Sequence, residues 1–99
     1  MAKFDVHPLR NGRGLVVDCQ SDLLDRIATR FVVPLMPADQ APAVMARLNP
    51  ICEVEGERYV FFPQLAGSIP TAALDRAIAS LADDDLTIGK ALDVLISGV

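Results

Sequence analysis

The side chains best suited to chemistry in this 99-residue sequence are few and scattered. His7 is the only histidine, and no serine or cysteine nucleophile accompanies it in a recognisable motif, so we expect an exposed strand residue. Cys19 and Cys52 lie in apolar runs without CxxC or Cys/His ligand spacing, which predicts buried free thiols rather than a zinc site. The residues alone therefore predict no catalytic centre, no metal site and no cofactor.

Two short motifs are better explained by local structure than by ligand binding. Gly12 and Gly14 form a GxG pair, but no third glycine follows and no helix is expected behind it, so a phosphate-binding loop is not indicated. The run Asp83–Asp85 lacks the spaced ligands of a calcium loop. It suits the start of a helix, where carboxylates accept hydrogen bonds from the first free N–H groups and favour the positive end of the dipole.

Composition predicts one soluble domain spanning residues 1–99. The chain is 52% hydrophobic, which excludes disorder, but no apolar run reaches the roughly 18 residues of a membrane span. A net charge of −4 argues against direct binding of nucleic acid, which depends on clustered Lys and Arg. The first residues are charged and no signal peptide is recognisable, so we expect a cytoplasmic protein. A domain of this size has little stability to spare and would gain from dimerisation.

Two hairpins are predicted from alternation and turn residues. The segment from Lys3 to Pro8 alternates apolar and polar side chains, and a turn at Asn11–Gly14 leads into an apolar strand from Leu15 to Cys19. A second hairpin pairs Ile51–Val54 with residues 58–62 across Glu55-Gly56. Both pairs favour an antiparallel sheet.

The strongest strand by composition is Arg30–Leu35, which is rich in β-branched and aromatic residues. Pro34 has no N–H to donate, so we expect this strand to lie at an edge, or to end there. A further short strand is predicted at Leu65–Ile69, between two prolines.

Two segments are harder to assign. Residues 37–50 are predicted to form a loop plus a short helix within Ala38–Leu48, although Pro42 interrupts the helical spacing. Residues 73–81 have apolar side chains at helical spacing but could equally be a strand and a turn. The predicted fold class is α+β: a mainly antiparallel sheet, or a small barrel, carrying one terminal helix.

That helix is expected from Asp83 to Val99, because its apolar residues follow one another at steps of three and four. They are Ile88, Ala91, Leu92, Leu95, Ile96 and Val99. Apolar residues continue to the last position, although chain ends are commonly polar. The helix is predicted either to dock along its length on its own domain or to present its end to a partner.

The polar segment Asp18–Asp25 encloses two adjacent leucines, Leu23 and Leu24. In an extended chain the two cannot both point inward, so either one or both are exposed or a short helical turn lets them share a face. These features predict a binding module without naming its partner.

The order of motifs along nearly the whole chain resembles the CcdB family of toxins. The motifs are Phe4-x-Val6, Val17-Asp18-Cys19-Gln20-Ser21-Asp22-Leu23-Leu24-Asp25, Arg30-Phe31-Val32-Val33-Pro34-Leu35, Leu48-Asn49-Pro50, Gly56, Ile69-Pro70 and Ile88-x-x-Ala91-Leu92-Asp93-x-Leu95-x-x-Gly98. The resemblance implies a Kid/MazF-like SH3-type barrel with a long C-terminal helix, assembled as a homodimer. It also implies a protein that binds the A subunit of DNA gyrase, traps the gyrase–DNA cleavage complex and is neutralised by a CcdA-like antitoxin.

The resemblance further implies which residues contact gyrase. The apolar pair after Gln-Ser-Asp corresponds to Leu23 and Leu24, and the polar residue of the last helix corresponds to Asp93. The remaining contacts fall on the chain end, at Ile96, Ser97, Gly98 and Val99. Plasmid-borne members carry a tryptophan where this chain has Ser97, and tryptophan is a residue that often anchors interfaces.

Three functions follow as hypotheses: a gyrase poison, a CcdB-like protein that binds its antitoxin but no longer poisons gyrase, and an endoribonuclease on the related MazF fold. The acidic charge and the lack of a His, Arg and Asp cluster in any motif argue against the third.

Overall fold

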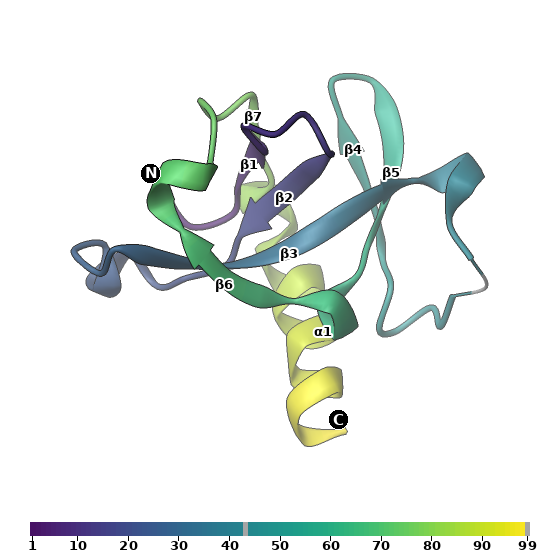
Figure 1. Cartoon of the computed structure of the whole chain (residues 1–99). Coiled ribbons are helices and arrows are strands. Elements are labelled where there is room, and N and C mark those ends of the chain that lie inside the picture. Colours follow the sequence, from purple (N-terminus) through teal and green to yellow (C-terminus); the bar gives the residue numbers. More distant parts are fainter. Residues whose placement is uncertain (43, 99) are drawn as a thin grey trace.

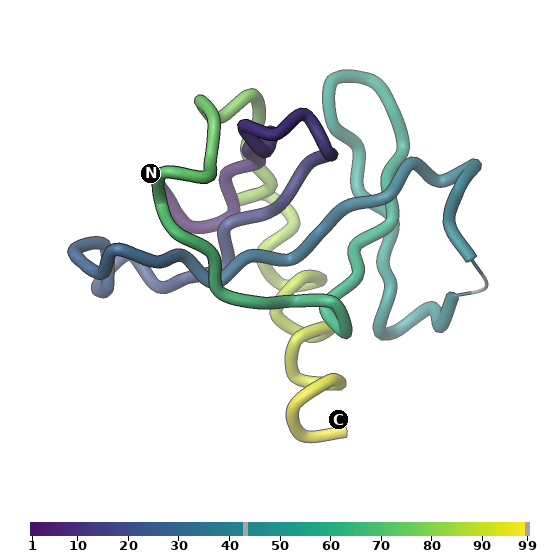
Figure 2. The backbone as a smooth tube through the Cα atoms, viewed as in Figure 1, coloured from purple at the N-terminus to yellow at the C-terminus, as the bar shows by residue number. Residues whose placement is uncertain are grey.

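The computed structural model describes residues 1–42 and 44–98. In this part of the chain, seven strands form one antiparallel sheet that curls into a nearly closed barrel, and one α-helix follows at the C-terminal end (Figures 1 and 2). The strands are β1 (Asp5–Pro8), β2 (Leu15–Asp18), β3 (Thr29–Pro37), β4 (Ile51–Val54), β5 (Glu57–Phe61), β6 (Gly67–Pro70) and β7 (Ala79–Ser80), and the helix is α1 (Asp85–Ser97). The α+β barrel class predicted from the sequence is confirmed.

The longest strand, β3, organises the sheet. One of its edges pairs with β2, and the other pairs first with β6, up to Val32, and then with β5, from Leu35 onward. The full order is β4-β5-β3-β2-β1-β7, with β6 beside the first half of β3. A strand with three partners must lie at the centre, so the expected edge position for Arg30–Leu35 is wrong.

Pro34 is tolerated at the centre because of where β3 changes partner. It lies opposite Val16 of β2, and its carbonyl oxygen accepts a hydrogen bond from Phe62 N at 3.1 Å. In a strand the N–H and C=O of one residue face the same side. The missing N–H of Pro34 therefore faces the side where the pairing with β6 has ended and that with β5 begins, so no ladder bond is lost.

The main core fills the inside of the barrel. It contains alternate residues of β1, β2 and β3 together with α1, and its fully buried members include Val6, Val17, Val33, Phe61 and Ile88. A smaller cluster on the other face of the sheet joins Val16, Val32 and Leu74. Because successive strand residues point to opposite faces, β2 and β3 are buried on both sides.

Both predicted hairpins are confirmed. The turn after β1 contains Gly12 at φ 75°, and the turn between β4 and β5 places Glu55 at φ 52° and Gly56 at φ 81°. Positive φ at both central residues is the geometry of a type I′ turn, whose twist matches the flanking strands.

The remaining connections are shorter and more extended than predicted. The described residues of Ala38–Leu48 form no helix, since Pro42 cannot donate to a helical ladder; a 3₁₀ turn stands at Ala38–Gln40. The strand expected at Leu65–Ile69 begins later, at Gly67, after a 3₁₀ turn at Pro63–Leu65. Residues 73–81 follow the strand-and-turn alternative: a 3₁₀ turn at Thr71–Ala73, a bridge from Leu74 to Leu9, and β7.

Helix α1 forms as predicted but is held along only part of its length. It begins at Asp85 after a 3₁₀ turn at Ala82–Asp84, and no side chain caps its first N–H groups, so the expected carboxylate cap is wrong. Only Ile88 and Ala91 are buried. Among the described residues, no helix has the length and apolar character needed to cross a membrane.

The C-terminal half of α1 extends beyond the strands (Figure 1). Leu95 is 41% exposed and Ile96 is 76% exposed, so the alternative in which the helix docks along its whole length on its own domain is wrong. Gly98 ends the helix at φ 78° and donates its N–H to Val94 O at 3.0 Å, a left-handed cap that suits glycine. Val99, the last residue of the predicted face, lies outside the described residues.

Candidate functional site

Leu23 and Leu24 lie on an exposed turn between β2 and β3. A 3₁₀ turn at Asp22–Leu24 carries them, so the short helical turn considered for this pair does form. It buries neither residue: Leu23 is 92% exposed and Leu24 is 48% exposed. Ile27, three residues on, is exposed as well. A large aliphatic side chain held almost wholly in water gains nothing from folding, which points to a contact outside the chain.

A buried ion pair closes the base of this turn. Arg30 Nη2 lies 2.6 Å from Asp18 Oδ2, and Arg30 Nε donates to the same oxygen at 2.9 Å. Both side chains are almost completely buried. Removing two charges from water costs free energy that the pair must recover through its own geometry. The turn is thus anchored at its base, at the end of β2 and the start of β3.

Further hydrogen bonds continue from this ion pair into the turn. Asp18 Oδ1 accepts the N–H of Gln20 at 3.1 Å, and Ser21 Oγ accepts the N–H of Leu23 at 3.2 Å. Asp22 Oδ1 accepts the N–H of Lys3 at 2.8 Å, which ties the turn to the N-terminal segment. The side chains of Asp18, Ser21 and Asp22, which the sequence marked as turn formers, therefore have specific partners.

The sequence pattern did not identify the partnership between Asp18 and Arg30. A signal was present, because a charged residue at the start of the most apolar strand needs a partner if that strand is buried. The expected edge position of that strand hid this signal, since an arginine on an edge can reach water.

The second predicted group lies at the C-terminal end of α1. Asp93, Ile96, Ser97 and Gly98 are all exposed. Within one chain this group lies apart from the Leu23–Leu24 turn: the helix end is at the bottom of Figure 1, and the turn is at its far left. The structure therefore presents two separate surfaces, not one cluster.

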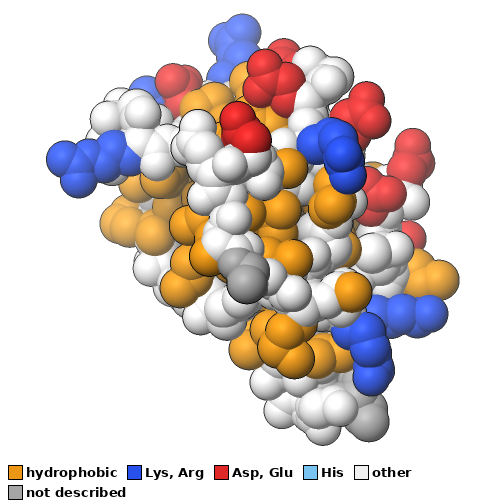
Figure 3. All heavy atoms as spheres, turned by 90° about the vertical axis from the view of Figure 1, so that its right-hand side faces the viewer, with side chains coloured by type: hydrophobic (Ala, Val, Ile, Leu, Met, Phe, Trp, Pro, Cys, Tyr) orange, Lys and Arg blue, Asp and Glu red, His pale blue; other side chains and the backbone are white. Residues whose placement is uncertain are grey.

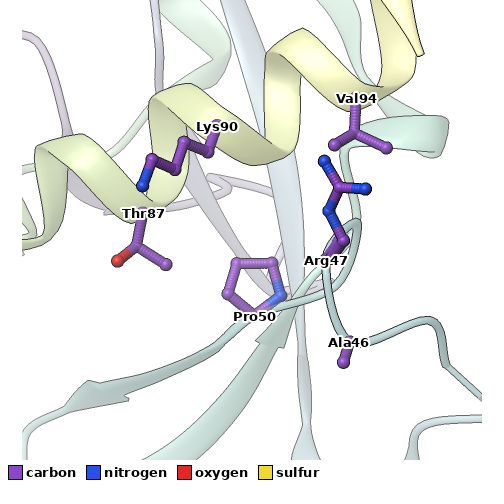
Figure 4. Close-up of a pocket in the computed structure, with 6 residues that line it drawn as sticks. All are labelled: Ala46, Arg47, Pro50, Thr87, Lys90 and Val94. Carbon is purple, nitrogen blue, oxygen red and sulfur yellow. The ribbon is translucent and has the colours of Figure 1, made fainter. Parts of the chain in front are cut away.

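A groove of about 410 Å³ runs between α1 and the segment before β4. Thr87, Lys90 and Val94 line it from the helix. Figure 4 shows Arg47 extending from the loop toward Val94, with Pro50 on the same loop. Lys90 and Arg47 have no carboxylate within ion-pair distance in the described part of the chain. The groove is thus lined by apolar surface and two cations, although the whole chain is acidic.

Hydrophobic side chains also gather on the face that contains β4, β5 and the segment from Ala38 to Pro50. Figure 3 shows them in the middle of this face, with acidic side chains along its upper edge. The exposed large apolar residues of this part of the chain are Val44, Met45 and Ile51. Contiguous apolar surface of this kind is typical of protein interfaces.

His7 is buried, so its expected exposure is wrong. It lies on the outer face of β1 beneath the segment that leads to β7, and its Nδ1 lies 2.8 Å from Asp75 O. Its Nε2 has no hydrogen-bond partner among the described residues. Arg10 Nε donates to the neighbouring carbonyl of Leu74 at 3.0 Å. Tertiary folding thus brings His7, Arg10, Asp75 and Arg76 around one pocket, a cluster that no sequence motif announces.

Cys19 and Cys52 are buried free thiols, as predicted. Burial raises the pKa of Cys19 to about 12, with a further rise from the Asp18 carboxylate, and burial raises the pKa of Cys52 to about 11. A thiol whose pKa is higher in the folded chain favours folding below its unfolded pKa, and this contribution is lost as pH rises toward the folded pKa.

We therefore expect the free energy of unfolding to fall by about 1 kcal/mol per thiol between about pH 9 and pH 10. Urea unfolding monitored at both pH values measures this loss. The double variant Cys19→Ala/Cys52→Ala controls for the other groups that titrate in this range. An equal loss in that variant would show that the thiols are not its source.

Comparisons with known proteins agree on the fold and give the family. The structure is similar to the Mycobacterium tuberculosis toxin MazF-mt6, with a TM-score of 0.76 at 13% identity over 93% of this chain and 95% of that one. It is also similar to an endoribonuclease in complex with its cognate antitoxin from a mycobacterial species, with a TM-score of 0.79 at 12% identity over 97% and 94% of the two chains. These two likenesses show the barrel fold. The model of the family described as CcdB protein matches residues 3–98, nearly the whole chain. The chain therefore belongs to the CcdB family of toxins from toxin–antitoxin systems.

Proposed function

We propose that this chain binds the A subunit of DNA gyrase, traps the gyrase–DNA cleavage complex and is neutralised by a CcdA-like antitoxin. The observation that carries the proposal is the display of Leu23, 92% exposed, on a turn anchored by the buried pair of Asp18 and Arg30. Membership of the CcdB family supports the same assignment. The gyrase-contacting residues are Leu23, Leu24, Asp93, Ile96, Ser97, Gly98 and Val99.

The proposed mechanism is conformational trapping by a homodimer. A ligand that binds one gyrase conformation more tightly than the others shifts the population toward it, with no catalysis by the ligand. The two separate surfaces of one chain each occur twice in a twofold dimer, which suits a symmetric target such as the gyrase A dimer. Assembly as a homodimer would also cover part of the exposed apolar surface.

The groove between α1 and the segment before β4 supports an antitoxin partner. Its apolar lining with Arg47 and Lys90 complements a peptide segment that carries both carboxylates and apolar side chains. The same face of α1 leads from Thr87 past Val94 toward Ser97. An antitoxin in this groove would therefore lie beside the proposed gyrase contacts.

Purified gyrase tests the proposal directly. We expect micromolar toxin to inhibit supercoiling and to stabilise a cleavage complex that releases linear DNA on denaturation, and we expect antitoxin to reverse both effects. The absence of inhibition and of cleaved DNA at micromolar toxin would exclude gyrase poisoning. Antitoxin binding without poisoning would identify the first alternative, in which Ser97 in place of tryptophan has cost the gyrase contact.

RNA cleavage is a second candidate, favoured by the pocket that contains His7, Arg10, Asp75 and Arg76. Imidazole, guanidinium and carboxylate groups are suited to proton transfer and to stabilising a phosphate. Against it, His7 Nδ1 and Arg10 Nε are both engaged by main-chain carbonyls. Incubating RNA with the purified chain and with a His7→Gln variant tests this candidate. Cleavage that depends on His7 would support a nuclease, and the absence of cleavage by the unmodified chain would exclude one.

A further inference from the structure

We propose that Gln20 is a positioning residue that sets the conformation in which Leu23 and Leu24 are presented to gyrase. This inference rests on the proposed function and assigns a role to a side chain that itself lies behind the contact surface. Gln20 is only partly exposed and joins the turn to the central strand of the barrel.

The amide group of Gln20 makes two hydrogen bonds in opposite directions. Its Oε1 accepts the N–H of Phe31, in β3, at 2.9 Å. Its Nε2 donates to the carbonyl oxygen of Leu24, in the turn, at 2.9 Å. The backbone N–H of Gln20 is in turn held by Asp18 Oδ1 at 3.1 Å. The side chain of Gln20 thus connects the central strand to the leucine pair, and its backbone N–H connects the same residue to the buried ion pair.

Few other hydrogen bonds fix the turn to the barrel. In the part of the chain that the structure describes, residues 22–27 are joined to segments outside the turn by the bond between Asp22 and Lys3 N. Apart from the bond to Gln20, their remaining bonds are internal: Leu23 N donates to Ser21 Oγ, Leu24 N to Ser21 O and Ile27 N to Leu24 O. The next residue, Ala28, is held from outside the turn, because its carbonyl oxygen accepts from Thr71 N and Thr71 Oγ1, both at 2.9 Å. The carbonyl oxygen of Leu24 that accepts from Gln20 also accepts from Ile27 N, so Gln20 fixes the carbonyl to which Ile27 is bonded.

Such a bridge matters for binding because Leu23, 92% exposed, gains almost nothing from folding. An exposed side chain on a loose turn must be ordered when it binds, and that ordering reduces the affinity. A turn held in its bound shape avoids this cost. Gln20 is therefore expected to affect the affinity for gyrase more than it affects the stability of the barrel.

Two substitutions separate the two hydrogen bonds. Gln20→Met has a similar length but makes neither bond. Gln20→Glu retains an oxygen that can accept from Phe31 N but has no donor for the carbonyl of Leu24. Gln40→Met is the matched control, because Gln40 is exposed and its side chain makes no hydrogen bond to a described residue.

Hydrogen exchange followed by NMR measures the order of the turn without gyrase. We expect the amides of Leu24 and Ile27 to exchange about tenfold faster in both Gln20 variants. The amide of Phe31 is expected to lose protection in Gln20→Met but to keep it in Gln20→Glu. Unchanged exchange at Leu24 and Ile27 in both variants would overturn the proposal, whatever gyrase does.

Surface-plasmon measurements with the immobilised gyrase A dimer measure the consequence for binding. We expect both Gln20 variants to bind about tenfold more weakly, with the melting temperature within a few degrees of the parent chain, and Gln40→Met to bind normally. Faster exchange with full affinity would also overturn the positioning role. If the unmodified chain fails to bind gyrase, the proposed function fails, and the exchange data alone then decide whether Gln20 orders the turn.

Discussion

Replacing Arg30 by methionine is expected to destabilise the fold by about 3–5 kcal/mol, because it leaves the Asp18 carboxylate buried without its counter-charge. Asp18 is fully buried, and Arg30 supplies both the nearest cation and a hydrogen bond from Nε. The loss is a large fraction of the stability of a 99-residue domain. Urea unfolding followed by circular dichroism measures it.

The matched double variant distinguishes a charge effect from lost packing. Arg30→Met/Asp18→Leu replaces both charges with apolar side chains and is expected to recover most of the stability, since an apolar pair avoids the cost of burying charge. Arg26→Met, on an exposed arginine of the same turn, should leave stability unchanged. If the Arg30→Met variant had a free energy of unfolding less than about 1 kcal/mol below that of the parent chain, the ion pair would not be an anchor of this region.

Deleting Ser97–Val99 is expected to leave a folded chain that no longer binds gyrase. The buried residues of α1 are Ile88 and Ala91, so the deletion removes no described side chain from the core. It removes the cap bond from Gly98 N to Val94 O and should lower stability by only about 1 kcal/mol. Loss of the proposed contact should weaken gyrase binding at least about 30-fold.

Two point variants on α1 refine this prediction. Ile96→Ser changes an exposed residue at the end of the helix, and Leu86→Ser changes one of similar exposure in its first turn. Only Ile96→Ser should weaken binding to the gyrase A subunit, measured by calorimetry beside a thermal melt of each variant. A truncated chain that unfolds would instead show that the helix end serves docking onto its own barrel.

Local rules were enough for the elements whose cause lies within a few residues. The hairpins around Gly12 and Gly56 form because their turns need positive φ, and α1 forms because its apolar residues recur at helical spacing. The exposed pair Leu23 and Leu24 was also visible, since two adjacent leucines in a polar turn cannot share one buried face of a strand.

Rules of the same kind failed where the outcome depended on a distant segment. Among the described residues of 38–48, apolar side chains at helical spacing form no helix: a 3₁₀ turn stands at Ala38–Gln40, and a separate turn at Met45 ends on Asn49, which donates to Phe61 O of β5. Pro34 suggested an edge strand, although β3 changes partner at this residue and tolerates a missing N–H. The alternation of apolar and polar side chains from Lys3 to Pro8 predicted that His7 is exposed, but the segment that leads to β7 covers it.

By itself, the sequence determined the antiparallel sheet with one terminal helix, the hairpin turns, and the motifs that place the chain in the CcdB family. Only the tertiary structure decided that Asp18 meets Arg30, that Gln20 bridges β3 and the leucine turn, and that α1 is buried only in its first half. The physical reason is how far apart along the chain the interacting residues lie. Turn geometry and helical periodicity are set by neighbouring residues, whereas the burial of a charge, and the exposure of a helix end, depend on which segments the barrel brings together.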